Sequence, residues 1–395
     1  MRISLVAILA LVIMNIIIDI FIYHKLKKTN KGWLKKTHVV FSAILYFCLG
    51  YIYYASDHRV TNNDMVTLMW MLFTHLSIYV PKYVYAGIEV FSLLPLLWKG
   101  KQWKWLSKTA SIVSFALLFI FWWSALVTPR NFIVNEVTIE SEKLPKAFDG
   151  YTIAQFSDLH SGTYGKSTGI MENMVEEINR LHPDMIAFTG DIVNRNSDEL
   201  LPFIETLRQL KAKDGVVSIL GNHDYGDYMR WKQPKDKKKD FAQMIAVQRD
   251  SLGWLLLKNQ SAFLHRDNDS ILLIGTENYM KKEKVNYCRL DKSYPKENTA
   301  FKILLSHNPE HWEDEVVNKT DIDLTLAGHT HAMQSMIKIG NKKFSPSSMR
   351  YRHWAGLALE NGQYLYVNVG IGEVGIPIRI GANPEITLLT LKKKK

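Results

Sequence analysis

The spacing of apolar residues along the chain changes near residue 130. Before that point lie four long, almost uninterrupted apolar stretches, at residues 3–23, 38–55, 65–98 and 109–128. A helix of about 20 apolar residues is long enough to cross roughly 30 Å of hydrocarbon. After residue 130, apolar runs of strand length alternate with polar segments that contain glycine. We therefore predict a multi-pass transmembrane region of about four helices over residues 1–130, followed by a globular domain.

A cleaved signal peptide is the alternative interpretation of the first apolar stretch. Three further apolar stretches follow it and no small-residue cleavage site is evident, so we favour a membrane helix. Asp19 lies near one end of this stretch, and Lys82 adjoins Pro81 in the third. We expect both charged side chains to reach toward the membrane interface.

Lysines in this region are concentrated in two of the connecting segments. Residues 25–36 contain six lysines and residues 99–108 contain four. Lysine-rich loops are biased toward the cytoplasmic side. Four crossings then place the domain after Arg130 outside the cytoplasm, as part of a multi-pass protein of the cell (inner) membrane. If Pro81-Lys82 forms a tight hairpin instead, five crossings place the domain inside.

The net charge of +11 belongs almost entirely to the membrane region. Residues 1–130 hold 14 Lys and Arg against 4 Asp and Glu, whereas the rest of the chain holds 35 against 34. A nearly neutral globular part does not indicate a nucleic-acid partner. The two cysteines, Cys48 and Cys288, do not imply a disulfide framework. The sequence does not indicate an oligomeric state.

The globular part opens with alternating strand and helix patterns. Short apolar runs predict strands at residues 152–156, 185–188, 216–220, 271–274, 301–305, 322–326, 364–369 and 386–391. Residues 167–181 and 199–211 have helical periodicity between the first strands, which is typical of the α/β class. Fewer helices separate the later strands, so we expect a second sheet packed on the first.

Side chains of the types that commonly bind metal ions follow five of these apolar runs. The five segments are Asp158-Leu159-His160, Gly190-Asp191, Gly221-Asn222-His223-Asp224, Ser306-His307 and Gly328-His329-Thr330-His331. The carboxyl ends of strands in α/β sheets are where ligands bind, so we expect these side chains to converge. Carboxylate, amide and imidazole donors without a thiolate suit Mn²⁺, Fe or Zn²⁺.

Two of the segments place one residue between two candidate ligands. In Asp158-Leu159-His160 and in His329-Thr330-His331, an extended backbone would point both ligand side chains the same way. Each pair could therefore bind one metal ion or reach two neighbouring ions.

In these five segments the sequence resembles the calcineurin-like metallophosphoesterases, which carry the same blocks in the same order. The tail segments Gly370-Ile371-Gly372, Ile376-Pro377-Ile378-Arg379 and Pro384-Glu385 resemble the bacterial membrane-attached branch of that superfamily. The resemblance covers roughly residues 148–392 and implies a four-layer αββα sandwich. We assign residues 131–147 to a linker and entry strand, and residues 148–395 to the metallophosphoesterase domain.

The resemblance also implies a role for each candidate site residue. The first of two divalent metal ions would be bound by Asp158, His160 and His331. The second would be bound by Asn222, His307 and His329. Asp191 would bridge the two ions. His223 would not bind metal, but would stabilise the pentacoordinate phosphorus or protonate the leaving oxygen, oriented by Asp224.

Two details bear on how this site would work. Many members of the superfamily have an acidic residue shortly after the Gly-Asp block, where this chain has Asn194; its amide can hydrogen-bond to His223 but supports the charged ring less. The lysine-rich segment 230–240 is either a solvated loop or a loop that overhangs the site and meets an anionic substrate.

We therefore expect a membrane-anchored, metal-dependent phosphoesterase that hydrolyses a phosphomonoester or phosphodiester with a metal-bridging hydroxide as nucleophile. A lipid-linked or envelope substrate near the bilayer is one candidate. The alternative is a catalytically inactive domain that serves as a binding or sensor module for the membrane helices. The complete ligand set argues against that alternative, because a binding module has no evident need for it.

Overall fold

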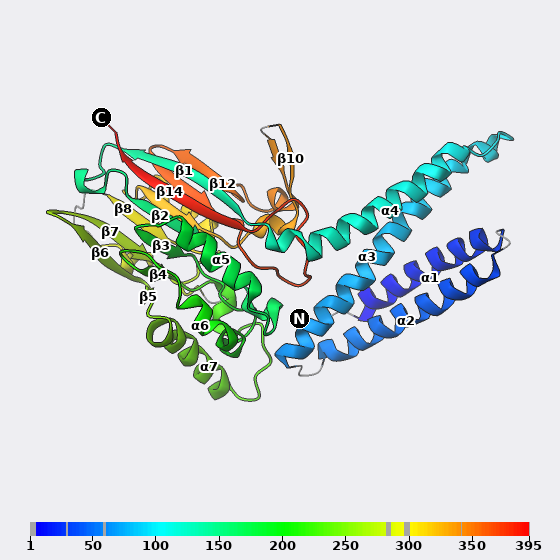
Figure 1. Cartoon of the computed structure of the whole chain (residues 1–395), viewed down its shortest axis with the longest axis horizontal. Coiled ribbons are helices and arrows are strands. Elements are labelled where there is room, and N and C mark those ends of the chain that lie inside the picture. Colours follow the sequence, from blue (N-terminus) through cyan, green and yellow to red (C-terminus); the bar gives the residue numbers. More distant parts are fainter. Residues whose placement is uncertain are drawn as a thin grey trace. The chain divides into compact units, whose positions relative to one another are not determined.

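The computed structural model describes residues 5–28, 31–57, 61–281, 286–295, 301–340 and 342–394. The chain divides into two compact units. One comprises Met1–Leu126 with Gly375–Ile378, and the other comprises Val127–Val374 with Arg379–Lys395. Figure 1 shows the helices of the first unit and the sheets of the second.

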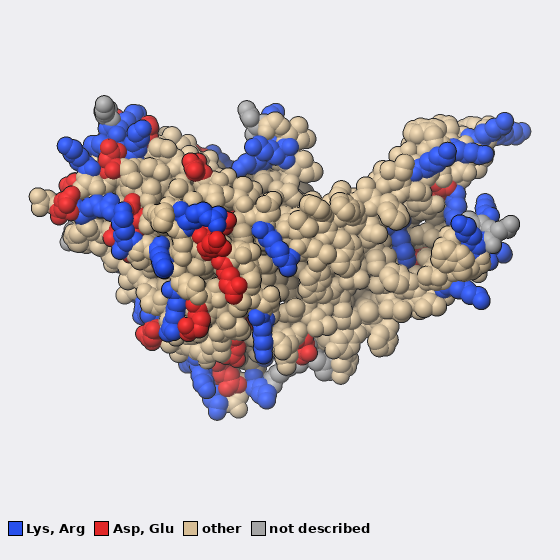
Figure 2. Space-filling model, in the orientation of Figure 1, with Lys and Arg blue, Asp and Glu red and all other residues tan. Residues whose placement is uncertain are grey.

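Four long helices form most of the first unit. They are α1 (Leu5–Lys27), α2 (Gly32–Asp57), α3 (Asn62–Ser92) and α4 (Lys104–Leu126), with a short 3-10 turn η1 (Leu94–Trp98) after α3. Each long helix has the length and apolar composition needed to cross a membrane. Lys and Arg gather at one end of this unit in Figure 2. Helix α3 continues through Pro81, so the chain does not turn back at Pro81-Lys82 as a hairpin would require.

Asp19 is largely buried among the helices of this unit. Its Oδ1 accepts a hydrogen bond from Lys82 Nζ at 2.8 Å. Its Oδ2 accepts from the hydroxyls of Tyr46 at 2.7 Å and Tyr79 at 2.8 Å. Lys82 Nζ also donates to Ser42 Oγ at 3.2 Å. Asp19 and Lys82 therefore form an ion pair with each other, and their expected reach toward the membrane interface stays a prediction.

Two six-stranded sheets form the framework of the second unit. The first sheet has the order β1 (Ile133–Ser141), β14 (Glu385–Lys393), β2 (Thr152–Phe156), β3 (Met185–Phe188), β4 (Val216–Ser218) and β5 (Leu255–Leu256). The second has the order β12 (Gly356–Glu360), β13 (Gln363–Val367), β9 (Leu324–Ala327), β8 (Lys302–Leu305), β7 (Asp269–Gly275) and β6 (Gln260–Arg266). A separate ribbon pairs β10 (Ile337–Ile339) with β11 (Lys342–Phe344).

Both sheets are mixed, with parallel strands at their centres. Strands β2 to β5 are mutually parallel, and so are β7, β8, β9 and β13. Strand β1 pairs along its whole length with β14. Residues 133–141, which we assigned to a linker and entry strand, are therefore an edge strand of the first sheet.

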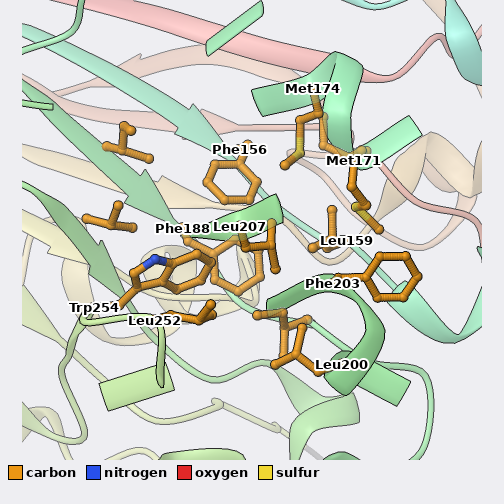
Figure 3. Close-up of a cluster of buried hydrophobic side chains, with 14 of the residues drawn as sticks. Phe156, Leu159, Met171, Met174, Phe188, Leu200, Phe203, Leu207, Leu252 and Trp254 are labelled. Carbon is orange, nitrogen blue, oxygen red and sulfur yellow. The ribbon is translucent and has the colours of Figure 1, made fainter. Parts of the chain in front are cut away.

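Successive buried side chains along a strand point to opposite faces of its sheet, and this explains the layers of this unit. Along β2, Ile153 points into the core between the sheets, and its neighbours Ala154 and Phe156 point to the other face of the first sheet. That other face packs against α5 (Gly169–Arg180), α6 (Ile204–Leu207) and α7 (Pro234–Ala246). Figure 3 shows Phe156 and Phe188 among Met171, Met174 and Leu207 in this cluster.

The outer face of the second sheet has a thinner helical cover. Trp312 and Val316, in the helical turn η8 (Trp312–Val316), and Leu290 of the short helix α8 (Leu290–Ser293) pack on apolar residues of β7 and β8. Helices, two sheets and helical turns thus follow one another in four layers. The predicted αββα sandwich preceded by apolar helices is confirmed.

Candidate metal centre

The seven candidate ligands lie at the carboxyl ends of strands from both sheets. Asp158, Asp191 and Asn222 follow β2, β3 and β4 of the first sheet. His307 and His329 follow β8 and β9 of the second. Parallel strands deliver their carboxyl ends to one edge, and the packing of the two sheets brings the two edges together.

One group of ligands consists of Asp158, His160 and His331. The Nε2 atoms of His160 and His331 lie 3.1 Å apart. His331 Nε2 lies 3.1 Å from Asp158 Oδ1. One donor atom from each residue lies within 4.8 Å of the others, and all three residues are buried.

A second group consists of Asp191, His307 and His329, with Asn222 beside them. His307 Nε2 lies 3.1 Å from Asp191 Oδ2, and His329 Nδ1 lies 3.3 Å from His307 Nε2. Asn222 Oδ1 lies 2.9 Å from His329 Nδ1. Asp191 Oδ2 is also 3.7 Å from His160 Nε2 in the first group. The Asp191 carboxylate therefore lies between the two groups.

This donor set fits two cations. Two ring nitrogens 3.1 Å apart can share at most one proton, so a cation beside His160 and His331 would satisfy both lone pairs. His307 Nδ1 donates to the Thr189 carbonyl at 2.8 Å, which leaves its Nε2 to face Asp191. Such a bond on the far ring nitrogen fixes the ring and the tautomer of a metal ligand.

The ligands of the second group are oriented in the same way. Tyr351 Oη lies 3.1 Å from His329 Nε2, which leaves Nδ1 toward His307. Asn222 Nδ2 donates to Tyr228 Oη at 2.9 Å, which turns Oδ1 toward His329. Each ligand thus presents the atom that a hard or borderline metal ion prefers.

The surroundings set the protonation states of several ligands; burial alone would lower the pKa of His307, but the Asp191 carboxylate outweighs burial and raises it to about 9. Burial alone would raise the pKa of Asp158 and of Asp191, but the imidazoles around them outweigh burial and lower both pKa values below the usual range. Burial and the neighbouring imidazoles lower the pKa of His160, and they lower that of His329 to about 3. The carboxylates are therefore anionic and these two rings neutral.

The backbone around the ligands is not extended. Asp158, His160, Asp191, His329 and His331 all have φ between 45° and 73°. Such left-handed conformations cost of order 1–3 kcal/mol each for residues other than glycine and gather at functional sites. The expectation of extended Asp-x-His and His-x-His segments is wrong. Tight turns bring Asp158 and His160 into one group and separate His329 from His331.

Two glycines make room for the carboxylates. A Cβ on Gly221 would overlap the Asp191 carboxylate. A Cβ on Gly328 would overlap Ser157 Oγ and the Asp158 carboxylate. The glycines before the Asn222 and His329 blocks are therefore needed for close approach of the backbone to the two aspartates.

His223 lies beside both groups. Its backbone N–H donates to Asp191 Oδ1 at 2.7 Å, and its ring Nδ1 donates to the Asn194 carbonyl at 2.7 Å. The ring contacts His160 edge-on, with centroids 4.8 Å apart, and stacks on Tyr228 at 4.0 Å. Because Nδ1 is used, Nε2 is the ring atom left for exchanging a proton with a substrate.

Asp224 has a different environment from the one we expected. Its Oδ2 accepts from the backbone N–H groups of Asp191 and Gly221, both at 2.9 Å. Its Oδ1 accepts from the N–H groups of Ile192 and Val193 at 2.9 and 3.3 Å. Burial and the nearby Asp191 carboxylate raise the pKa of Asp224 to about 7, whereas the amides favour its anion. Asp224 thus holds the loop that carries Asp191, and the Asn194 carbonyl orients His223.

The Asn194 side chain also differs from expectation. Its Nδ2 donates to Thr163 Oγ1 at 3.1 Å, so the main chain of Asn194 rather than its amide contacts His223. Glu199 Oε2 accepts from the backbone N–H groups of Asn194 at 2.6 Å and Arg195 at 3.2 Å. This buried carboxylate fixes the turn that presents the carbonyl.

A cleft of about 450 Å³ opens beside the second group. It is lined by Asn222, Tyr228, Asn278, Met280, Lys281, Asn308, Glu310, His329, Arg350 and Tyr351. Lys281 and Arg350 bring positive charge to the cleft and Glu310 brings negative charge, and Lys281 also pairs with Asp314 at 2.6 Å. The lysines of segment 230–240, most of which belong to α7, are not among these described lining residues. Of the two alternatives for this segment, the one in which the lysines meet the substrate at the site is therefore not supported.

Apart from Asn222 and His329, the cleft residues were not identified from the sequence. Arg350 and Tyr351 follow the 3-10 turn η10 (Pro346–Met349) rather than a strand. Tyr228 lies in the segment after the Asn222 block, and Asn308 and Glu310 follow the His307 block, so proximity to these blocks was the available signal. Their positions depend on loops whose course is set by tertiary packing.

Comparison with known proteins agrees with this geometry. The family model for calcineurin-like phosphoesterases matches residues 151–333. The chain is 32% identical over 269 residues to the uncharacterized metallophosphoesterase YkuE of Bacillus subtilis, covering 67% of this chain and 87% of that protein. It is 29% identical to a transmembrane protein with metallophosphoesterase domain of Danio rerio, covering 66% of this chain and 57% of that protein. The chain belongs to the calcineurin-like metallophosphoesterase family.

Proposed function

We propose that this protein is a membrane-anchored phosphoesterase that hydrolyses a phosphomonoester or phosphodiester at a dinuclear metal site. The observation that carries the proposal is the convergence of seven ligand side chains from two sheets, with His223 beside them. The family holds divalent metal ions in a dinuclear site. In this chain Asp158, His160 and His331 would hold one ion, and the other would be held by Asn222, His307 and His329.

Asp191 is the proposed bridging ligand. Its Oδ2 lies near nitrogen atoms of both groups, at 3.1 Å from His307 and 3.7 Å from His160. Bound Mn²⁺, Fe or Zn²⁺ would lower the pKa of a water to make a nucleophile and neutralise the phosphate oxygens. The backbone N–H of His223 holds the other oxygen of Asp191 in place.

His223 and the cleft residues supply the remaining functions. In the imidazolium form of His223, Nε2 would donate a hydrogen bond to a phosphate oxygen or a proton to the leaving oxygen, while Nδ1 keeps its bond to the Asn194 carbonyl. Lys281 and Arg350 would bind an anionic part of the substrate within the cleft. Asp224 would act as a positioning residue through the Asp191 loop. A lipid-linked or envelope phosphoester suits a domain tethered by apolar helices.

We further propose that the catalytic domain faces away from the cytoplasm, at the cell membrane. The continuous course of α3 through Pro81 supports four crossings, and the two lysine-rich segments support a cytoplasmic location for the loops that contain them. Reporter fusions at the C-terminus test this orientation. An alkaline phosphatase fusion would be active and a green fluorescent protein fusion dark; the reverse pattern would place the domain in the cytoplasm.

An inactive binding module is the competing function. To distinguish the two, the full chain would be purified in detergent, loaded with Mn²⁺ and assayed on a chromogenic phosphodiester and a chromogenic phosphomonoester. We expect hydrolysis of at least one, abolished in Asp191→Ala and in His223→Ala. Full metal occupancy without hydrolysis of either ester would favour the binding module.

A further inference from the structure

A second type of ligand cluster lies outside the dinuclear site. Cys288 precedes α8, and His311 and Glu315 lie one helical turn apart after β8. Cys288 Sγ lies 3.4 Å from His311 Nε2, and Glu315 Oε2 lies 3.3 Å from the same nitrogen. One donor atom from each residue lies within 4.8 Å of the others. Two separate segments therefore bring a thiol, an imidazole and a carboxyl group to one point.

The orientation of the His311 ring decides what this cluster can do. Its Nδ1 is hydrogen-bonded to Ser306 Oγ at 2.7 Å, and the ring stacks on Tyr279 with centroids 4.8 Å apart. Cys288 and Glu315 therefore both face Nε2. A Cys-His-acid nucleophile would need the thiol on one ring nitrogen and the acid on the other. This geometry excludes such a triad.

A single ring nitrogen also cannot satisfy both neighbours by hydrogen bonding. Nε2 carries either one proton, which it can donate to Glu315, or one lone pair, which can accept from Cys288. A cation placed among the three groups would bond to all of them at once. His311 is fully buried and Cys288 is 6% exposed, so water has little access to the imidazole and the thiol, whereas the Glu315 side chain is 43% exposed.

We propose that Cys288, His311 and Glu315 form a third metal site, which takes a thiophilic divalent ion such as Zn²⁺. Thiolate, imidazole and carboxylate are the ligands that zinc prefers, and three of them leave a fourth position for water. Zinc bonds of about 2.0–2.3 Å at tetrahedral angles place neighbouring donor atoms roughly 3.3–3.6 Å apart. The separations of 3.4 and 3.3 Å from His311 Nε2 match this geometry.

The proposed ion would join two segments that line the substrate cleft. Asn278 and Lys281 precede Cys288 in the sequence, and Asn308 and Glu310 closely precede His311. Ser306, which holds the His311 ring, is also the neighbour of the dinuclear ligand His307. The third ion would thus support the cleft wall and would not contact the substrate. The site does not depend on hydrolytic activity.

Metal content and cobalt absorption of the full chain in detergent test this proposal. The protein would be loaded with Zn²⁺, desalted and analysed for zinc per chain, as wild type and as Cys288→Ser. Cys48→Ser is the matched control, because Cys48 is the other cysteine in the sequence. We expect Cys288→Ser to hold one zinc ion fewer per chain than wild type and Cys48→Ser. Loading with Co²⁺ should give a near-ultraviolet thiolate-to-cobalt band in wild type and Cys48→Ser.

Two further measurements keep the test independent of folding defects. Glu315 has a side chain 43% exposed, so Glu315→Gln should fold normally and lose the third ion to a chelator at least tenfold faster than wild type. The wild-type cobalt spectrum requires no variant. The same zinc content in wild type and Cys288→Ser, or no thiolate-to-cobalt band in wild type, would overturn the proposal.

Discussion

The Nε2 atoms of His160 and His331 lie 3.1 Å apart in a position sheltered from solvent. The Asp158 carboxylate completes this group. Because it is buried, water does not stabilise its negative charge. A bound cation would relieve the contact between two ring nitrogens and pair with the carboxylate. Metal binding should therefore be linked to the stability of the folded domain.

We predict that removing metal ions lowers the thermal stability of the protein. A ligand present at 100 times its Kd stabilises the native state by about 2.7 kcal/mol, and two sites would add to this effect. Differential scanning fluorimetry with EDTA and after return of Mn²⁺ would measure the change. His331→Ala should show a smaller rise on Mn²⁺ addition. Equal melting temperatures with and without metal would contradict the prediction.

Asp224 offers a test of how the Asp191 loop is held. Its two oxygens accept from four backbone N–H groups, and an amide could replace only one of these oxygens as an acceptor. We predict that Asp224→Asn lowers the free energy of unfolding by about 2–5 kcal/mol, because it leaves buried donors opposed by an NH₂ group. Chemical denaturation would measure the loss.

The matched control is Asp267→Asn, at an exposed turn residue whose positive φ suits asparagine. Its unfolding free energy should stay within about 0.5 kcal/mol of wild type. A stable Asp224→Asn protein with full activity would show that Asp224 is not needed to position Asp191. A stable protein that had lost activity would instead favour a direct chemical role for Asp224.

The strands and the ligand segments of this domain could be predicted because their signals are local. Apolar runs such as 152–156 and 185–188 need to be buried on both faces, and a polar ligand immediately after each run marks the strand end. The chemical types of the seven ligands also follow directly from the sequence. These features do not depend on how loops pack.

Other features depend on contacts between distant segments and were not predictable. His223 bonds to the Asn194 carbonyl rather than to Asp224, because the turn that Glu199 holds presents this carbonyl to the ring. The left-handed φ of His160 is imposed by tertiary packing, since local preference opposes it. Cys288 and His311 are 23 positions apart, and neither belongs to a motif.

Asp184, which lies away from the carboxyl ends of the strands, provides a prediction of how the stability of the domain depends on pH. Its Oδ1 pairs with Lys213 at 2.7 Å and Arg266 at 3.1 Å, and its Oδ2 accepts from Thr152 N–H at 2.9 Å. Burial alone would raise the pKa of Asp184, but these partners outweigh it and lower the pKa to about 2. The ordinary value for an aspartate is 3.8.

Because the folded-state pKa is the lower one, the stabilisation from Asp184 is fully present above pH 4 and is lost as pH falls toward 2. Because Lys213 is largely exposed, we expect Asp184 to contribute about 1–2 kcal/mol to the free energy of unfolding, less than its pKa shift alone would imply. Asp184→Asn should be less stable than wild type by that amount at pH 7, and the gap should close near pH 2. Urea unfolding of metal-free protein at each pH would measure it. A gap independent of pH would contradict the assigned cause.

The ion pair between Asp19 and Lys82 gives a prediction for the helical unit. Removing one partner of a buried pair leaves an uncompensated charge, which costs about 3–5 kcal/mol. We predict that Asp19→Asn and Lys82→Gln each destabilise the detergent-solubilised protein strongly, whereas the double variant loses less than the sum of the two. Lys104→Gln, at an exposed lysine of α4, is the control and should have little effect. Denaturation in graded detergent mixtures would measure each stability. Additive losses in the double variant would mean that the two charges do not stabilise each other, and that Asp19 is held by its other partners, which include Tyr46, Tyr79 and His38.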